Sequence, residues 1–145
     1  MSNKLGKVIM YTIRHTCLIV KDLEKSLKFY TNVLGFRLSS RDTLTGDYPE
    51  KLMGLYGADV KYAKVRDKND NEIELIQSNR DLKPHMAFTV DDIDAAYEAL
   101  KEDLVFISPP FNAPDTAARV CHALDMDQNE IEFVQVLDKT PKKRR

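Results

Sequence analysis

The chain is poor in cysteine. Only two of its 145 residues are cysteines, Cys17 and Cys121, and no CxxC spacing occurs. Two cysteines make no disulfide framework of the kind that holds small secreted domains together. We therefore interpret both side chains as small, buried and reduced.

Long apolar runs are also missing. No stretch approaches the roughly 20 apolar residues that a membrane-spanning helix needs. The first residues, MSNKLGKVIMYTIRH, contain neither the apolar segment nor the small-residue cleavage site of a signal peptide. These absences predict a cytoplasmic protein without a membrane partner.

An excess of charge of one sign is absent as well. Lysine and arginine together number 22 and aspartate and glutamate 23, for a net charge of −1. Such a balance gives no general attraction to nucleic acid. The basic ending PKKRR is interpreted as a solvated tail rather than a nucleic-acid contact. With 43% hydrophobic residues, the composition is typical of one globular domain with a core.

What the chain does contain is a repeat. The stretch NEIELIQ (71–77) returns as NEIEFVQ (129–135). Upstream, HTCLIVKDLEKSLKFY from His15 aligns without gaps with HMAFTVDDIDAAYEAL from His85. Both matches indicate a duplicated unit.

Each copy predicts a strand, a helix and three further strands, so we expect an α+β fold of two βαβββ modules. Apolar residues at helical spacing follow Asp22 and Asp92, whose side chains suit helix N-caps. Gly35 suits the end of the first helix, because glycine accepts the left-handed conformation. The remaining strands are expected at RLSSRD and VKYAKVR in the first copy and at LVFISP and AARVCHAL in the second.

The two modules are predicted to form a single domain, since the join between them is short. The boundaries are expected at residues 11–137 for the domain, 11–79 and 82–137 for the modules, and 1–10 and 138–145 for the tails. The first module is longer because it contains TGDYPEKLMGLYGAD (45–59). We interpret this segment as a short helix or loop, with Pro49 in a first helical turn.

Strand side chains alternate between the two faces of a sheet. In both copies one face is strongly apolar and is expected to pack on the helices. The opposite face carries a histidine and two carboxylates in each copy: His15, Glu72 and Glu74, and His85, Glu130 and Glu132. A histidine and a glutamate from each copy would suit a divalent metal of the first transition row. Carboxylates on a strand often only face solvent, but a solvent face has little reason to repeat both residue types.

At these residues the chain resembles the vicinal oxygen chelate superfamily, which includes glyoxalase I, methylmalonyl-CoA epimerase, extradiol dioxygenases and the fosfomycin and bleomycin resistance proteins. HTCLIVKDLEKSLKFYTNVLGF is similar to the family's opening strand and helix, and DMDQNEIEFVQ is similar to its closing turn and strand. The resemblance covers about Tyr11 to Leu137. It implies two βαβββ modules that form a cupped mixed sheet around a metal, and it implies a homodimer.

The resemblance also implies a ligand set and an activity. His15, Glu74, His85 and Glu132 fall at the family's metal-ligand positions, a set similar to that of bacterial glyoxalase I. The expected cofactor is one divalent ion, Ni, Co, Mn, Fe or Zn. The expected activity is that of a glyoxalase I-like (lactoylglutathione lyase family) lyase or isomerase, which abstracts a proton next to a metal-chelated carbonyl of a small-molecule substrate. The alternatives are a methylmalonyl-CoA epimerase-like isomerase, an extradiol-type dioxygenase and a resistance protein that binds a small molecule without chemistry.

Glu132 is the first choice for the catalytic base, and Glu74, at the pseudo-symmetric position, is the second. Lys64 and His122 occupy equivalent positions on the neighbouring strands, where either could assist as an acid or contact the substrate. We interpret His122 as a bystander on its strand.

Two positions depart from glyoxalase I. Asn32 stands where that enzyme usually carries a basic residue, and Ser78 stands where it tends to carry an asparagine that contacts glutathione. These departures argue against glutathione as the substrate. The sequence leaves open the substrate, the native metal, and whether the site lies within one chain or between two.

Overall fold

The computed structural model describes residues 8–114 and 117–137. The predicted C-terminal tail, 138–145, and residues 1–7 of the predicted N-terminal tail lie outside the described residues. Within the described ranges, no helix is long and apolar enough to cross a bilayer. Both cysteines are free and buried, as we predicted.

Each half of the chain follows the predicted order of one strand, one helix and further strands. The first half consists of β1 (Tyr11–Ile19), α1 (Leu23–Lys28) with the π-helical turn η1 (Phe29–Val33), β2 (Arg37–Leu44), α2 (Asp47–Met53), β3 (Val60–Arg66) and β4 (Glu72–Ser78). The second half consists of β5 (His85–Val90), α3 (Ile93–Leu100), β6 (Val105–Phe106), β7 (Phe111–Asn112), β8 (Ala118–Leu124) and β9 (Glu130–Val136). The predicted α+β class is confirmed. The segment LVFISP forms only the short β6, because Pro109 and Pro110 lack the backbone donors that would extend its ladder.

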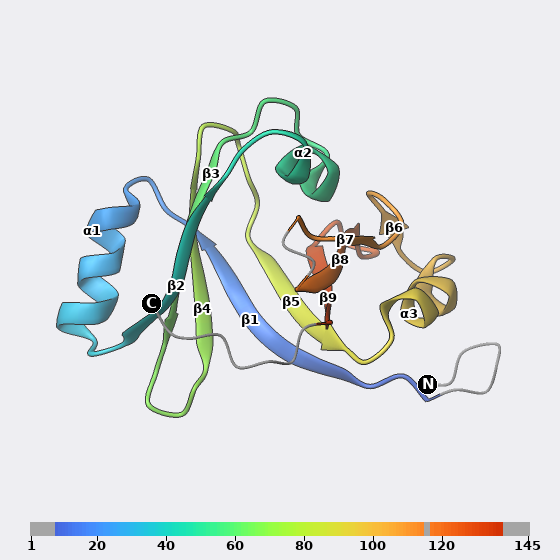
Figure 1. The fold of residues 1–145 in the computed structure, drawn as a ribbon, viewed down its shortest axis with the longest axis horizontal. Helices are drawn as coiled ribbons and strands as arrows, with labels where there is room; N and C mark the ends of the chain where they lie inside the picture. Colours follow the sequence, from blue (N-terminus) through green and yellow to red (C-terminus); the bar gives the residue numbers. More distant parts are fainter. Residues whose placement is uncertain (1–7, 115–116, 138–145) are drawn as a thin grey trace.

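The strands form one mixed sheet in the order β2-β3-β4-β1-β5-β9-β8-β6, with β7 paired to β8. β1 pairs in parallel with β4, and β5 pairs in parallel with β9. At the centre, β1 and β5 pair antiparallel, so the two modules lie side by side. The sheet curves into the cup that the resemblance implied, with α1 and α3 outside it, one on each half (Figure 1).

Side-chain hydrogen bonds begin α1 and α3 at the predicted residues. The Asp22 carboxylate accepts from the backbone N–H of Lys25 at 3.1 Å, and the Asp92 carboxylate accepts from that of Ala95 at 3.0 Å. After η1 the chain turns at Gly35, whose φ of +75° is the left-handed conformation expected at a helix end.

The glutamines that close the repeated strands have the same structural role in both halves. Gln77 Oε1 accepts from the backbone N–H of Leu23 at 2.8 Å, and Gln135 Oε1 accepts from that of Ile93 at 2.9 Å. Each glutamine therefore ties the last strand of its module to the start of its helix, which explains why the repeat extends to this residue.

The apolar face of each half packs on its own helix, as predicted. Leu27 and Leu75 are buried between α1 and the sheet. Ile93 and Phe133 are buried between α3 and the sheet. Ile9, which we placed in the N-terminal tail, is also buried in this second cluster.

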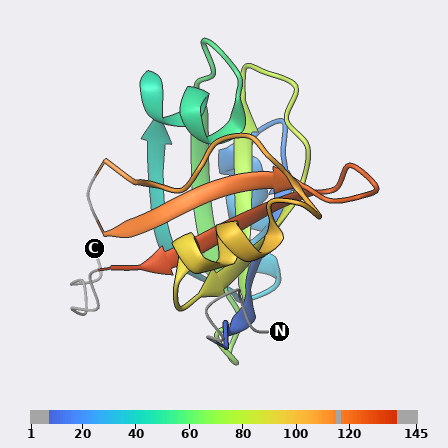
Figure 2. The ribbon, with the colours of Figure 1, turned by 90° about the vertical axis from the view of Figure 1, so that its right-hand side faces the viewer.

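α2 is the additional segment of the first module. It lies across the concave side, near β7 and β8 of the second half (Figures 1 and 2). Leu52 packs with Val120 and Val134, and Pro49 is buried in the first turn. The helix α2, which only the first module contains, therefore packs against strands of the second module.

Candidate metal centre and active site

The two predicted histidines meet at the centre of the concave face. His15 lies on β1 and His85 lies on β5, the strands that pair where the modules join. Their ring centroids are 5.8 Å apart, and both side chains are buried. The two halves of a single chain therefore supply this pair.

Glu74 approaches both histidines. Its Oε1 atom is 3.5 Å from Nε2 of His15 and 3.5 Å from Nε2 of His85. Both Nε2 atoms are buried, and neither has a hydrogen-bond partner among the described residues. Buried polar atoms are normally paired. The donor types and their spacing are those of a site that could hold a metal ion.

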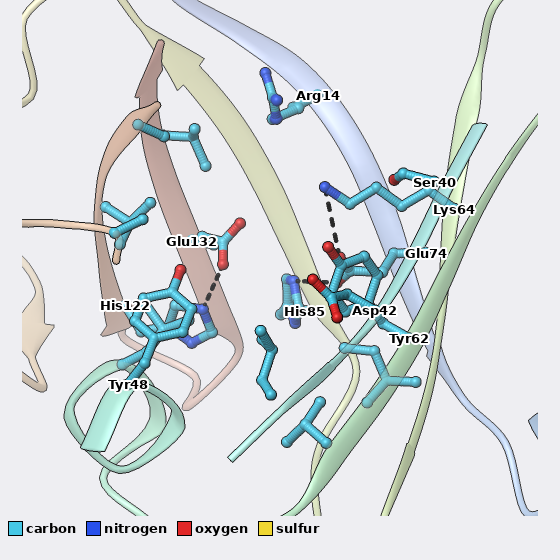
Figure 3. A pocket seen from close by; sticks show the side chains of 18 of the residues that line it. Arg14, Ser40, Asp42, Tyr48, Tyr62, Lys64, Glu74, His85, His122 and Glu132 are labelled. Carbon is cyan, nitrogen blue, oxygen red and sulfur yellow. Dashed lines mark hydrogen bonds and ion pairs between the residues drawn. The ribbon is translucent and has the colours of Figure 1, made fainter. Parts of the chain in front are cut away.

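Glu132 belongs to a second group, which shares His85 with the first. Ligand atoms of His85, His122 and Glu132 lie within 4.8 Å of one another. Glu132 Oε2 is 2.8 Å from Nε2 of His122, which is 1% exposed. The structure thus brings ligand atoms of His15, Glu74 and His85 together, and the second group adds Glu132 beside His85. Figure 3 shows Glu74, His85, His122 and Glu132 around the cavity. His122, which we interpreted as a bystander, lies against the first choice for the base.

Glu72 supports His15 from behind. Its Oε2 atom accepts a hydrogen bond from Nδ1 of His15 at 3.0 Å, and its Oε1 atom is 3.0 Å from Nη2 of Arg66. A carboxylate in this position fixes the ring orientation and the tautomer of a ligand histidine. Our sequence interpretation placed Glu72 on the correct face but assigned it no partner. The signal lies in the parallel register of β1 against β4, which sets Glu72 opposite His15.

The two central imidazoles differ in proton affinity. Burial lowers the pKa of His15, but the hydrogen bond to Glu72 and the charge of the nearby Glu74 carboxylate outweigh burial and raise that pKa to about 9. Burial lowers the pKa of His85, and the nearby carboxylates do not reverse this. A proton and a metal ion are alternatives on the same nitrogen. His85 would therefore bind a cation more readily than His15, from which the cation would first have to displace a proton.

Glu72 and Glu132 are ionised at neutral pH. Burial raises the pKa of Glu72, but the hydrogen bond from His15 and nearby cations outweigh it and lower the pKa to about 2. Burial likewise raises the pKa of Glu132, and the hydrogen bond from His122 brings it below its ordinary value. Both groups can thus accept hydrogen bonds or bind a cation at neutral pH.

A cavity of about 710 Å³ opens beside these groups. Its polar lining includes Arg14, Lys64, Glu74, His122 and Glu132 (Figure 3). Its apolar lining comes from α2 and from strands of both halves, including Leu52, Met53, Val60, Val120, Val134 and Val136. This volume and the mixture of apolar wall and few polar groups suit a small organic molecule.

The chain is similar in sequence and in fold to several known proteins. The chain matches the model of the Glyoxalase/Bleomycin resistance protein/Dioxygenase superfamily over residues 12–133. It is 35% identical over 132 residues to a lactoylglutathione lyase of Neisseria meningitidis, covering 83% of this chain and 88% of that protein. It is 32% identical over 130 residues to the uncharacterized protein YwbC of Bacillus subtilis, covering 85% of this chain and 96% of that protein. Its fold is similar to that of methylmalonyl-CoA epimerase from Mycobacterium tuberculosis, with a TM-score of 0.67 and 16% identity over 88% of this chain and 89% of that one.

Proposed function

The chain belongs to the Glyoxalase/Bleomycin resistance protein/Dioxygenase superfamily, and from this premise we propose that it is a metal-dependent lyase or isomerase of the glyoxalase I type. In this proposal His15, Glu74, His85 and Glu132 hold one divalent ion, Ni, Co, Mn, Fe or Zn. The substrate is a small molecule that presents two neighbouring oxygens to the ion. Glu132 removes a proton from the carbon next to its carbonyl group.

The observation that carries the proposal is a pair of buried Nε2 atoms that have no hydrogen-bond partner among the described residues. They belong to His15 and His85, and each lies 3.5 Å from the same oxygen of Glu74. Burying an unpaired polar atom costs free energy. A cation would satisfy both nitrogens and the carboxylate together, and imidazole with carboxylate is a donor set that suits the proposed ions.

Glu132 has the properties of a base for this chemistry. A bound divalent ion supplies Lewis-acid polarisation of the substrate carbonyl. The protein must then accept the proton from the adjacent carbon. The Glu132 carboxylate lines the cavity, and it is ionised at neutral pH, as a proton acceptor must be. A positioned base contributes about 10²–10⁴-fold to the rate.

Glu74 is the alternative base. Its Oε2 atom is 3.8 Å from Nζ of Lys64, and its Oε1 atom contacts both central histidines. These neighbours hold the carboxylate on two sides, which suits an ion ligand better than a group that must reach a substrate proton. We therefore assign Glu74 mainly to ion binding.

Binding without chemistry is the competing function. A cup of this shape could sequester a small molecule, but sequestration does not require buried histidines with unpaired nitrogens beside two carboxylates. An epimerase would use the same proton abstraction on a different substrate. The choice between these functions therefore depends on the ion and on the substrate.

The test is a metal analysis of protein purified without a histidine tag, followed by turnover assays after loading with each proposed ion. Hemithioacetals, CoA thioesters and catechols separate the lyase, epimerase and dioxygenase functions. Turnover of a hemithioacetal or a thioester that is lost in Glu132→Gln would support the proposal. A protein that binds no divalent ion at micromolar concentration would contradict it and favour sequestration.

We also propose that the protein is a homodimer. Large apolar side chains are exposed along and after the first helix, including Phe29, Val33 and Leu34. Exposed apolar surface of this kind is typical of protein interfaces. Light scattering should report the mass of two chains. The mass of one chain would contradict the dimer and leave the proposed ion site intact, since one chain supplies all its candidate ligands.

A further inference from the structure

A bulge in β1 adds to the cavity an arginine that the repeat does not contain. The register of β1 against β5 shifts between Ile13 and His15, so Arg14 is an extra residue in this ladder. Neighbouring residues of a regular strand point to opposite faces, and a bulge re-aims one of them. Arg14 can therefore line the cavity although the adjacent His15 also reaches Glu74 on the concave side.

Most hydrogen-bond donors of the Arg14 guanidinium have no partner among the residues that the structure describes. Its Nη1 atom donates to Oγ1 of Thr89 at 3.2 Å. Arg14 makes no ion pair within the part of the chain that the structure describes. A guanidinium presents several N–H groups in a planar fork, so the remaining donors are available to a molecule in the cavity.

The other cations of the cavity lining already have carboxylate partners. Nζ of Lys64 is 3.8 Å from Glu74 Oε2, and Nη2 of Arg66 is 3.0 Å from Glu72 Oε1. In Figure 3 the Lys64 ammonium is drawn between Arg14 and the group formed by Glu74 and His85. Arg14 thus adds a positive charge that the proposed ion ligands do not neutralise.

We infer that Arg14 binds an oxyanion of the substrate, a carboxylate or a phosphate, at the end remote from the two oxygens that would chelate the ion. This inference rests on the proposed function, because the ion anchors the other end of the substrate. Guanidinium groups bind carboxylates and phosphates through paired, charge-assisted hydrogen bonds. The apolar lining would contact the chain that joins the two ends. The substrate class is therefore a small anionic carbonyl compound.

Asp42 also lines the cavity, and its negative charge would repel an anion placed beside it. Its carboxylate accepts from the backbone N–H of Thr43 at 2.7 Å, and it forms no ion pair with Arg14. The substrate oxyanion would therefore lie at the Arg14 side of the cavity and not beside β2.

Hydroxamates test this assignment because they chelate a cation through two neighbouring oxygens. Succinate monohydroxamate carries a carboxylate, butanohydroxamate is its neutral counterpart of equal length, and a phosphonate of the same length distinguishes the two oxyanions. Calorimetry with the metal-loaded protein measures each affinity. We expect at least one anionic compound to bind about tenfold or more tightly than the neutral one, as for a hydrogen bond to a charged group.

The variants separate the charge of Arg14 from the net charge of the protein. Arg14→Gln should abolish the preference and leave the affinity for butanohydroxamate unchanged, whereas Arg14→Lys should retain part of the preference. Arg41→Gln is the matched control, since Arg41 pairs with Glu24 of α1 outside the cavity. Asp42→Asn should preserve the preference as well.

Three results would overturn the inference, and they differ in whether the proposed ion site survives. The role of Arg14 would be contradicted if the unmodified protein bound the anionic and neutral hydroxamates equally well. It would also be contradicted if the preference for the anionic compound survived in Arg14→Gln. In both cases, binding of butanohydroxamate would still support the proposed ion site. Failure of every hydroxamate to bind the metal-loaded protein would remove the proposed ion site and this inference with it.

Discussion

In the first half of the molecule Lys64 approaches Glu74 at 3.8 Å, whereas in the second half His122 approaches Glu132 at 2.8 Å. Each of these residues stands opposite its glutamate in the same antiparallel ladder of its module. A lysine is a strongly hydrated point charge on a flexible stem, whereas an imidazole is a planar ring with two distinct nitrogens. Two carboxylates of equivalent position therefore have different neighbours.

The turns before these carboxylates, by contrast, agree in detail. Asp67 accepts from the backbone N–H of Asn71 at 2.9 Å, and Asp125 accepts from that of Asn129 at 2.9 Å. Residues that recur in both halves thus set the backbone and place the candidate ligands. Residues that occur in one half only, such as Lys64, make the two sides of the cavity chemically different. This difference would decide which glutamate acts as the base and which end of a substrate each side receives.

Exchange of each glutamate for glutamine tests this division most strongly. Glu132→Gln should lower kcat by about 10²–10⁴-fold with little change in substrate affinity, because it removes a base but keeps an oxygen ligand. Glu74→Gln should instead weaken ion binding and lower kcat less when the ion is saturating. Steady-state kinetics with titrated metal measures both. The reverse order would make Glu74 the base.

His85 belongs to both groups of potential ligands, so its loss should affect ion binding most. His85→Ala should lower the affinity for a divalent ion by roughly a hundredfold or more, since loss of a residue that only supports a ligand already costs about 10–100-fold. Competition with a chromogenic chelator measures the affinity. His122→Ala leaves His15, Glu74 and His85 in place and should have the smaller effect. An equal loss of ion affinity in His85→Ala and His122→Ala would indicate that the ion binds at the group formed by His85, His122 and Glu132.

Glu72 and Glu130 occupy equivalent positions but differ in their contacts. Glu72 accepts from His15 at 3.0 Å, whereas Glu130 is 4.0 Å from Nδ1 of His122. Glu72→Gln should therefore lower ion affinity by about 10–100-fold, and Glu130→Gln should change it less. A difference in the opposite direction would contradict the support that we assign to Glu72.

The effect of Glu72→Gln should also depend on pH. Glu72 helps to raise the pKa of His15 to about 9, so below this pH a proton competes with the ion for His15. The variant lowers that pKa and weakens the competition, which partly offsets the loss of orientation. Above the pKa the offset disappears, so the measured loss of affinity should increase as the pH rises toward 9.

Most of the helices and strands could be predicted, because the residues that begin and end them lie next to them in the sequence. Asp22 and Asp92 adjoin the helices that they cap, and Gly35 adjoins the helix that it ends. The meeting of the two halves depends instead on pairing between residues far apart in sequence. Neither the antiparallel contact of β1 with β5 nor the packing of Leu52 on Val120 has a local signature.

The candidate site divides in the same way. Alternation along the strands sufficed to place His15, His85 and the acidic residues on one face. The hydrogen bond from His15 to Glu72 could not be predicted, because it depends on the register of two parallel strands. Arg14 was missed because a bulge breaks the alternation on which the prediction relied.

The smallest predicted effect is a loss of folding stability when the hydrogen bond that ties the last strand of a module to its helix is removed. This loss should be equal in the two halves. Gln77 and Gln135 accept from the first helical N–H groups at nearly the same distance, 2.8 and 2.9 Å. Gln77→Ala and Gln135→Ala should each lower the free energy of unfolding by about 1 kcal/mol, the usual value of such a hydrogen bond. Urea denaturation measures this change. Gln→Glu at either position keeps an acceptor oxygen and should lose less, which separates the hydrogen bond from simple side-chain packing. A clear loss in one half only would mean that the two modules differ in their frame as well as in the chemistry around it.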